Sequence, residues 1–182
     1  MSTEQSSASI KEAPQATDDV ENKIRAKLQD LGIAFERHAH QSIMTAAEGI
    51  EISRRTGGLC MKNLFLQAKK EKRFYLLMQP GDKRLSFKAL EKELGLKHLQ
   101  FGSPDDLQRL LCTYPGAVTC LGLLFDAAGE VEVLVDSALE GVRLVDCHPC
   151  RNDVSYTIAF EDILQKWLPA TGHGAYRWVG AD

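Results

Sequence analysis

The sequence lacks the local signatures of the common nucleotide-dependent, metal-dependent and serine-dependent catalysts. Its 182 residues contain no G-x-S-x-G elbow, no Walker-type phosphate loop, no H-E-x-x-H pair and no G-x-G-x-x-G turn. Serine hydrolysis of the nucleophile-elbow type, NTP-driven chemistry and dinucleotide-dependent redox chemistry therefore have no support in the sequence.

Cysteine is scarce, and its spacing does not suit a structural role. The five cysteines are Cys60, Cys112, Cys120, Cys147 and Cys150. An odd and uneven set in a chain of this size does not make a disulfide framework. The stretch "VDCHPC" does hold a C-x-x-C, but no second C-x-x-C or H-x-x-x-H completes a zinc set. It remains open whether this stretch is a redox dithiol or whether His148 has another role.

Long apolar runs are also absent, so no membrane span is expected. Residues 1–17 are rich in Ser, Gln and Ala, lack a signal-peptide core, and predict a disordered leader before one domain at 18–182. Hydrophobic residues at 44%, charged residues at 26% and a net charge of −3 indicate a globular protein without a broad nucleic-acid-wrapping surface. We expect a cytoplasmic protein in a reducing compartment.

Five helices are predicted where apolar residues recur every three to four positions behind a capping residue. They run from Asp18 to Gly32, from the capping box at Thr45, from Ser86 to Gly95, from Ser103 with Pro104 at the first helical position, and over 161–168 up to Pro169. Pro169 is expected to end the last helix, because proline lacks a backbone N–H group.

Short apolar runs predict the strands. One hairpin is expected from 61–68 and 73–78, and a second from 121–126 and 131–136. Further strand-like runs occupy 33–37, 99–101, 141–147 and 154–160. About seven strands mixed with four or five helices, without an internal repeat, indicate a single α+β domain with a mixed, largely antiparallel sheet.

Four polar or flexible positions beside apolar strands are candidates for function. Lys62 and Asn63 precede "LFL", Gly116 lies in "PGAVTC" and His148 lies in "CHP". Each has an ordinary structural explanation, such as a solvated lysine, a turn glycine or a histidine bound to the backbone. The pattern alone establishes no function.

Six segments, taken in order, carry more information than any one of them. They are "GGLCMKNLFLQAKKEKRFYLLM", "DKRLSFKALEKELGLKHLQFGSPDDLQRLL", "YPGAVTCLGLLFD", "VEVLVDSALEG", "DCHPCRND" and "WLPATGH". In order and spacing they resemble the YbaK/prolyl-tRNA-synthetase editing-domain family, and within it the free-standing trans-editing proteins of the ProXp-ala (PrdX-like) type. The resemblance extends from about Val20 to the C-terminus.

The resemblance implies an aminoacyl-tRNA deacylase, which protects translation fidelity by hydrolysing the ester between a wrong amino acid and the 3′ end of a tRNA. The implied substrate is alanine on the proline tRNA, and no metal or other cofactor is implied. The implied partners are the acceptor end of that tRNA and prolyl-tRNA synthetase or a synthetase complex. Water, positioned with the tRNA's own 2′-hydroxyl, would attack the ester, so no enzyme nucleophile is needed.

Three catalytic positions follow from the resemblance. Lys62 matches the family lysine thought to hold the 3′-terminal adenosine or its phosphate. Gly116 matches the loop glycine that lets backbone N–H groups approach the scissile carbonyl, where donors stabilise an oxyanion. His148 matches the histidine of the family's F-H-P segment and would line the amino-acid pocket or contact the ester.

Four substrate-binding positions follow in the same way. Asn63 follows the family lysine, and Ala117 follows the loop glycine. Asp136 matches an aspartate that ends a strand and is expected to hold the substrate's α-ammonium group. Thr45 matches a threonine that precedes the second helix, near the same pocket.

Two departures from the family pattern bear on specificity. Cys120 stands where the loop usually has proline, and Cys147 stands where phenylalanine usually precedes the histidine. A larger or more mobile pocket would admit serine or cysteine in place of alanine. Two further alternatives are a non-catalytic module that binds tRNA or a synthetase, and a thiol redox protein built on Cys147 and Cys150.

Overall fold

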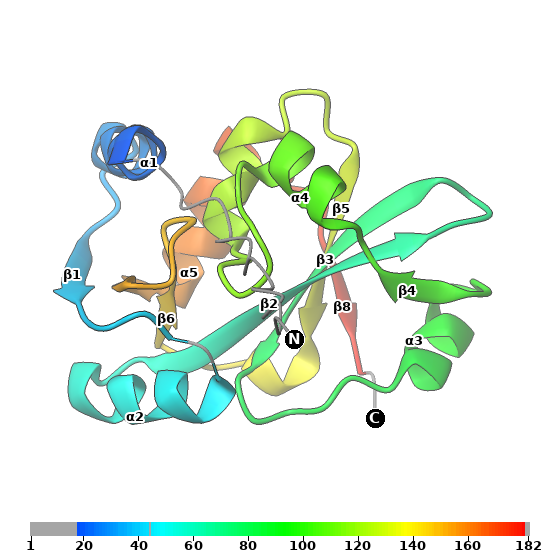
Figure 1. Cartoon of the computed structure of the whole chain (residues 1–182), viewed down its shortest axis with the longest axis horizontal. Coiled ribbons are helices and arrows are strands. Elements are labelled where there is room, and N and C mark those ends of the chain that lie inside the picture. Colours follow the sequence, from blue (N-terminus) through cyan, green and yellow to red (C-terminus); the bar gives the residue numbers. More distant parts are fainter. Residues whose placement is uncertain (1–17, 44, 181–182) are drawn as a thin grey trace, which may run out of the picture.

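The computed structural model describes residues 18–43 and 45–180, and its centre is one mixed sheet of eight strands (Figure 1). The strand order is β1-β7-β6-β2-β3-β5-β8, with β4 paired to the far end of β2. The strands are β1 (Phe35–Ala39), β2 (Leu59–Ala68), β3 (Arg73–Pro80), β4 (Leu99–Phe101), β5 (Val131–Asp136), β6 (Leu144–Cys147), β7 (Val154–Ala159) and β8 (Arg177–Val179). The predicted α+β class is confirmed, since four of the strand pairs are antiparallel.

Helical segments cover the sheet, as Figure 1 shows. They are α1 (Asp18–Asp30), α2 (Ala46–Thr56), α3 (Phe87–Leu94), α4 (Pro104–Leu111), the 3₁₀ segments η1 (Cys120–Phe125) and η2 (Ser137–Leu139), and a C-terminal run of α5 (Phe160–Asp162), the π-helical η3 (Ile163–Trp167) and α6 (Leu168–Ala170). Within residues 18–43 and 45–180, no helix has the length and apolar character needed to span a membrane.

The central strands are buried on both faces, which gives the domain two hydrophobic cores. In β3, Phe74, Leu76 and Met78 pack in the larger core with α1, α4, η1 and the C-terminal helical run. Tyr75 and Leu77 alternate with them and pack on the opposite face against α3. Side chains alternate between the two faces of a strand. A strand that is covered on both faces therefore has apolar residues at nearly every position of its sequence.

A buried carboxylate fastens α2 to the sheet. Asp146 in β6 accepts hydrogen bonds from the hydroxyls of Ser53 at 2.6 Å, Thr56 at 2.5 Å and Thr157 at 2.6 Å. A Cβ atom on Gly58 would lie 2.4 Å from this carboxylate, so only glycine allows the close approach. The start of β2, and with it the region around Lys62, is therefore held at a fixed distance from α2.

Most helix boundaries agree with the capping signals. The capping box at Thr45 and Glu48 is formed, Ser103 caps α4 with Pro104 in its first turn, and Gly95 ends α3 in the left-handed conformation. These signals act within a few residues of each other, so they can be recognised without knowledge of the tertiary structure.

Two predicted elements are wrong. Residues 120–125 form the 3₁₀ segment η1 rather than a strand, so the second hairpin does not exist, and β5 pairs in parallel with β3. Pro169 does not end the last helix, which continues to Ala170. The π-helical turn before it changes the hydrogen-bond partners, with Leu168 N–H donating to Ile163 O, and so accommodates the proline. An eighth strand, β8, was not predicted, and the proposed leader at 1–17 lies outside the described residues.

Candidate functional site

A gap along one edge of β2 contains a cavity. On this edge β2 pairs with β6 through residues 59–60 and with β4 through residues 66–68. Within the described residues, no strand pairs with this edge of residues 61–65, whose other edge pairs with β3. The cavity there has a volume of about 440 Å³ and is lined mainly by apolar side chains. We call it the β2 pocket. The residues that line it are Ile43, Thr45, Ala46, Gly49, β2 residues 60–65, Gly81, Phe101, Gly102, Pro104, Leu107, Pro115, Gly116, Val118 and His148.

Five of the seven predicted site residues meet in the β2 pocket. They are Thr45, Lys62, Asn63, Gly116 and His148. They come from four separate parts of the chain, so only the tertiary structure brings them together. A concave, largely apolar pocket with a few converging polar groups is the usual form of a small-molecule site.

Lys62 lies at the pocket with its ammonium group turned to a backbone loop. Its Nζ donates to the carbonyl of Gly81 at 3.1 Å and also contacts the carbonyl of Lys83. Partial burial lowers the pKa of Lys62 from its usual range. Carbonyl groups carry no formal charge, so the positive charge of Lys62 is held in place without being neutralised by them.

Asn63 is the next residue along β2, and its side chain projects from the opposite face of the strand. It is 6% exposed, and its Oδ1 atom has no hydrogen-bond partner among residues 18–43 and 45–180. Because a buried polar atom without a partner costs roughly 1–3 kcal/mol, such an atom at a cavity wall indicates a place for a donor from a ligand.

Gly116 gives the loop after α4 its shape. Its φ of +96° belongs to the left-handed region, and a Cβ there would meet no atom within 4 Å. The turn is closed by Ala117 N–H, which donates to Tyr114 O at 3.0 Å, and by the Thr113 hydroxyl, which donates to Ala117 O at 2.7 Å. Ala117 is fully buried, and it does not line the pocket. Gly116 and Val118 do line the pocket.

His148 reaches the pocket from the loop between β6 and β7. Its Nδ1 lies 2.9 Å from Val154 O, and a carbonyl can only accept, so Nδ1 carries the proton. Burial lowers the pKa of His148, and the nearby His40 ring, 6.2 Å away between centroids, lowers it further. The neutral ring then has Nε2 as an unprotonated acceptor.

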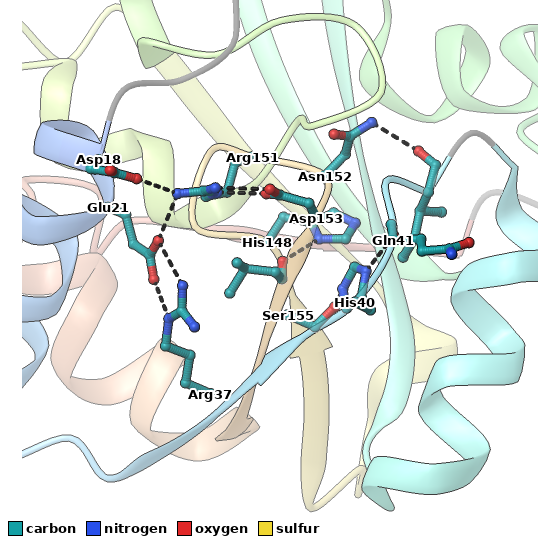
Figure 2. A network of polar contacts seen from close by, with 12 residues as sticks. Asp18, Glu21, Arg37, His40, Gln41, His148, Arg151, Asn152, Asp153 and Ser155 are labelled. Atoms are coloured by element: carbon teal, nitrogen blue, oxygen red, sulfur yellow. Dashed lines mark hydrogen bonds and ion pairs between the residues drawn. The ribbon is translucent and has the colours of Figure 1, made fainter.

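A charged network holds the loop that follows His148, as Figure 2 shows. Arg151 Nη1 contacts Asp18 at 2.7 Å and Glu21 at 3.1 Å, while its Nε contacts Asp153 at 2.5 Å. Glu21, 4% exposed, also receives bonds from Arg37 Nε at 2.6 Å and from the Tyr156 hydroxyl at 2.8 Å. The sequence predicted only that a helix starts at Asp18, whereas the network connects α1 to the His148 loop.

Asn152 joins three walls of the pocket and was not predicted. Its Nδ2 donates to Ile43 O at 3.0 Å, and its Oδ1 accepts from the Tyr114 hydroxyl at 3.1 Å. Ile43 N–H returns a bond to Asn152 O at 2.8 Å. In the sequence "RND" indicates only a turn, because the partners of Asn152 are distant along the chain.

Asp136, predicted to hold the substrate's α-ammonium group, does not line the β2 pocket. It is fully buried at the end of β5, where it forms an ion pair with Lys83 at 3.0 Å and accepts from Ala138 N–H at 2.9 Å. Lys83 in turn belongs to the loop that Lys62 and Gln79 hold through the Lys83 carbonyl. Through its ion pair with Lys83, Asp136 therefore helps to hold the loop that Lys62 contacts.

The cysteines are all free thiols, and Cys120, Cys147 and Cys150 are buried in the larger core. None of these three lines the β2 pocket. Contact with the Cys120 thiol and burial raise the pKa of Cys147, and burial raises that of Cys150. Across residues 18–43 and 45–180, no three His, Cys, Asp or Glu side chains are grouped as a metal site requires.

Comparisons with known proteins find both a family model and curated relatives that match this chain. The family model described as "Aminoacyl-tRNA editing domain" matches residues 40–166. The prolyl-tRNA editing protein ProX of Acetoanaerobium sticklandii is 34% identical over 155 residues, which cover 85% of this chain and 94% of that protein. The prolyl-tRNA synthetase associated domain-containing protein 1 of Mus musculus is 32% identical over 160 residues, covering 84% and 94%.

Solved structures share the fold. A crystal structure of a protein described as a candidate trans-editing enzyme for prolyl tRNA synthetase superposes with a TM-score of 0.65, at 16% identity, over 88% of this chain and 95% of that chain. The structure of the hypothetical protein APE2540 gives a TM-score of 0.66 at 18% identity, over 86% and 97%. At these identities the similarity concerns the fold alone.

Proposed function

Because the chain belongs to the aminoacyl-tRNA editing domain family, we propose that it is a prolyl-tRNA editing deacylase that acts in trans on a mischarged tRNA. The observation that carries the proposal is the convergence of Lys62, Asn63, Gly116 and His148 on one cavity of about 440 Å³. The relatives' names support editing of prolyl-tRNA. The finer proposal is that the ester removed is alanine on the proline tRNA.

The loop around Gly116 would stabilise the transition state. Water attacks the ester carbonyl carbon, the carbonyl oxygen becomes an oxyanion, and the bond to the ribose 3′-oxygen then breaks as that oxygen takes up a proton. The N–H groups of Gly116 and Val118 are the donors proposed for the oxyanion, while Ala117 keeps the turn closed. Removal of one such donor typically costs about 10²–10³-fold in rate.

His148 would orient the attacking water. With Nδ1 bonded to Val154 O, the neutral ring offers Nε2 to accept a hydrogen bond from that water. The tRNA's 2′-hydroxyl, next to the ester, is the second group proposed to position the water. No covalent intermediate with the protein is needed in this scheme.

Lys62 and Asn63 would hold the two ends of the substrate. The ammonium of Lys62 provides a point charge for the phosphate of the terminal nucleotide. The Oδ1 atom of Asn63 lacks a partner in the part of the chain that the structure describes, and we assign it to the α-ammonium group of the amino acid. Asn63 takes this role in place of Asp136, because Asp136 is engaged by Lys83 away from the pocket.

Selection of alanine over proline would work by size. Ile43, Met61, Phe65 and Val118 contribute to the apolar lining, where a larger ring has less room than a methyl group. Binding discriminates between amino acids that differ by one methylene by only about 1–3 kcal/mol, so a synthetase also attaches some wrong amino acids. A separate site that admits alanine and excludes the larger proline can remove the wrong one without hydrolysing the correct product. Cys120 and Cys147, which depart from the family pattern, lie in the core behind this lining.

The test is hydrolysis of proline tRNA charged in turn with alanine, serine, cysteine or proline. We expect fast release of alanine and slow release of proline, and a loss of activity in His148→Ala. Equal rates for alanine and proline would defeat the substrate assignment. Absence of hydrolysis for every ester would leave a binding module of the same fold, and serine or cysteine as the preferred substrate would reassign the specificity.

A further inference from the structure

An aromatic ring at the mouth of the β2 pocket is unusually exposed. Phe101 in β4 is 57% exposed, more than Leu144 at 43% or Trp178 at 36%. Burying such a ring within the fold would be favourable by about 25 cal/mol per Å² of apolar area. The fold nevertheless leaves this ring uncovered beside the pocket that it helps to line.

The ring of Phe101 packs against a second aromatic side chain. Phe87, at the start of α3, packs against it at 5.2 Å with an interplanar angle of 89°. The backbone of Phe101 is paired with Leu66 of β2, so the strand under the ring is fixed as well. A ring that is already oriented loses little conformational freedom when it binds a flat partner.

The proposed substrate has a flat group at the corresponding place. The ester is carried by the ribose of the last nucleotide, so the base of that nucleotide must lie within one sugar of Gly116 and His148. Phe101 lines the same cavity as those residues and as Lys62. Bases of single-stranded nucleic acid ends commonly stack on exposed aromatic side chains near basic groups.

We propose that Phe101 is a stacking platform for the terminal base of the tRNA's single-stranded 3′ end. This inference rests on the proposed function and adds a recognition residue to it. Stacking tolerates any base, so Phe101 sets the depth and orientation of the terminal nucleotide and leaves the choice of tRNA to other contacts. Phe101 therefore contributes mainly to the binding of the substrate and little to the rate of the chemical step, because the base is unchanged by hydrolysis.

Steady-state hydrolysis of alanyl-tRNA for proline tests the platform. Phe101→Ala and Phe101→Leu should each raise KM at least tenfold with kcat within about twofold of the wild type, while Phe101→Tyr should keep both values. Leucine keeps the apolar bulk and lacks an aromatic face, so it separates stacking from simple coverage. Leu144→Ala, another exposed apolar position outside the pocket lining, is the control and should change neither value.

Binding is measured separately, so that hydrolysis is not needed for the result. Phe101→Trp in a Trp178→Phe background leaves the buried Trp167 as the other indole. A short RNA ending in CCA should quench the new fluorophore, and the same RNA with an abasic last residue should bind at least tenfold more weakly. Equal binding of the two RNAs, or a wild-type KM in Phe101→Leu, would overturn the platform.

The two proposals fail in different ways. Quenching by the CCA end without hydrolysis of any charged tRNA would support the platform and defeat the deacylase proposal. Hydrolysis by the wild type with no change of KM in Phe101→Ala would defeat the platform and leave the deacylase proposal standing.

Discussion

His148 donates its Nδ1–H to the backbone carbonyl of Val154 across 2.9 Å, and this bond fixes which ring nitrogen is protonated. Burial lowers the pKa of the ring, so that it is neutral at neutral pH with Nε2 available as an acceptor. His148 thereby differs from a surface histidine, whose tautomer and charge follow the solvent.

The proposed role of His148 predicts a specific pH dependence. The neutral form is the active one, so kcat/KM should fall as pH falls through the pKa of His148, which lies below 6.5. His40→Gln removes a ring that lowers the pKa of His148 and lies 6.2 Å from it between centroids, so it should move this acidic limb to higher pH. The measurement is kcat/KM across the acidic range, with His38→Gln as the control. An unshifted limb in His40→Gln would argue against the ring pair.

Lys62→Ala should lower kcat/KM by about tenfold or more, the value of a charge-assisted bond to phosphate. The variant also removes one donor from the Gly81 carbonyl and one from the Lys83 carbonyl, so a matched control is needed. Gln79 Nε2 donates to the same Lys83 carbonyl at 2.8 Å. Gln79→Leu should therefore loosen the loop while it keeps the ammonium and most of the activity. An equal loss in both variants would mean that Lys62 acts only through the loop.

Gly116→Ala should destabilise the protein by about 1–2 kcal/mol, because its φ of +96° is unfavourable for a residue with a Cβ. The proposed oxyanion donors move with this turn, so kcat should also fall by about 10²-fold. Gly129, with φ +65° and an equally open Cβ position, lies outside the pocket lining. Gly129→Ala should lose similar stability and retain kcat, as thermal unfolding and single-turnover rates would reveal. Full kcat in Gly116→Ala would contradict the donor assignment.

Glu21 is predicted to be a major stabilising residue. Glu21→Ala leaves Arg37 and Arg151 without their buried partner and should cost about 3–5 kcal/mol in urea unfolding. Burial alone would raise the pKa of Glu21, but bonds from Arg37 and Tyr156 outweigh it, so the pKa lies below 4.5. This stability is therefore present above pH 4.5 and lost as pH falls through the lower folded value. Asp30→Ala, which breaks a 3.8 Å pair at an exposed side chain, should cost far less.

Because Cys147 and Cys150 are buried, we predict that the oxidation state of these thiols does not control the hydrolytic activity. Cys147→Ala and Cys150→Ala should reduce stability by about 1–2 kcal/mol through lost packing, and each should retain hydrolysis. A thiol reagent should modify the partly exposed Cys60 and Cys112 before either of them. Loss of activity in the double variant, with activity kept in His148→Ala, would restore the redox hypothesis for "VDCHPC".

Local signals in the sequence determined much of the fold. The caps at Thr45, Ser103 and Gly95 work through neighbouring backbone groups, and the β2–β3 hairpin follows from its apolar runs around a charged turn. Lys62, Asn63, Gly116 and His148 were likewise identified from segments of the sequence, and all four line one pocket.

Only the tertiary structure decided which distant groups meet. Residues 120–125 have the apolar content of a strand, yet Trp167 Nε1 donates to Cys120 O at 3.0 Å, in a helical turn packed against α4. Asp136 ends a strand as expected, but it pairs with Lys83, 53 residues away, and does not line the pocket. From the sequence, Phe101 is expected to be a buried apolar strand residue, but in the structure its side chain is exposed and lines the pocket. The apolar character of a residue indicates that its side chain can be buried. Which residues it packs against depends on which helices and strands lie beside it.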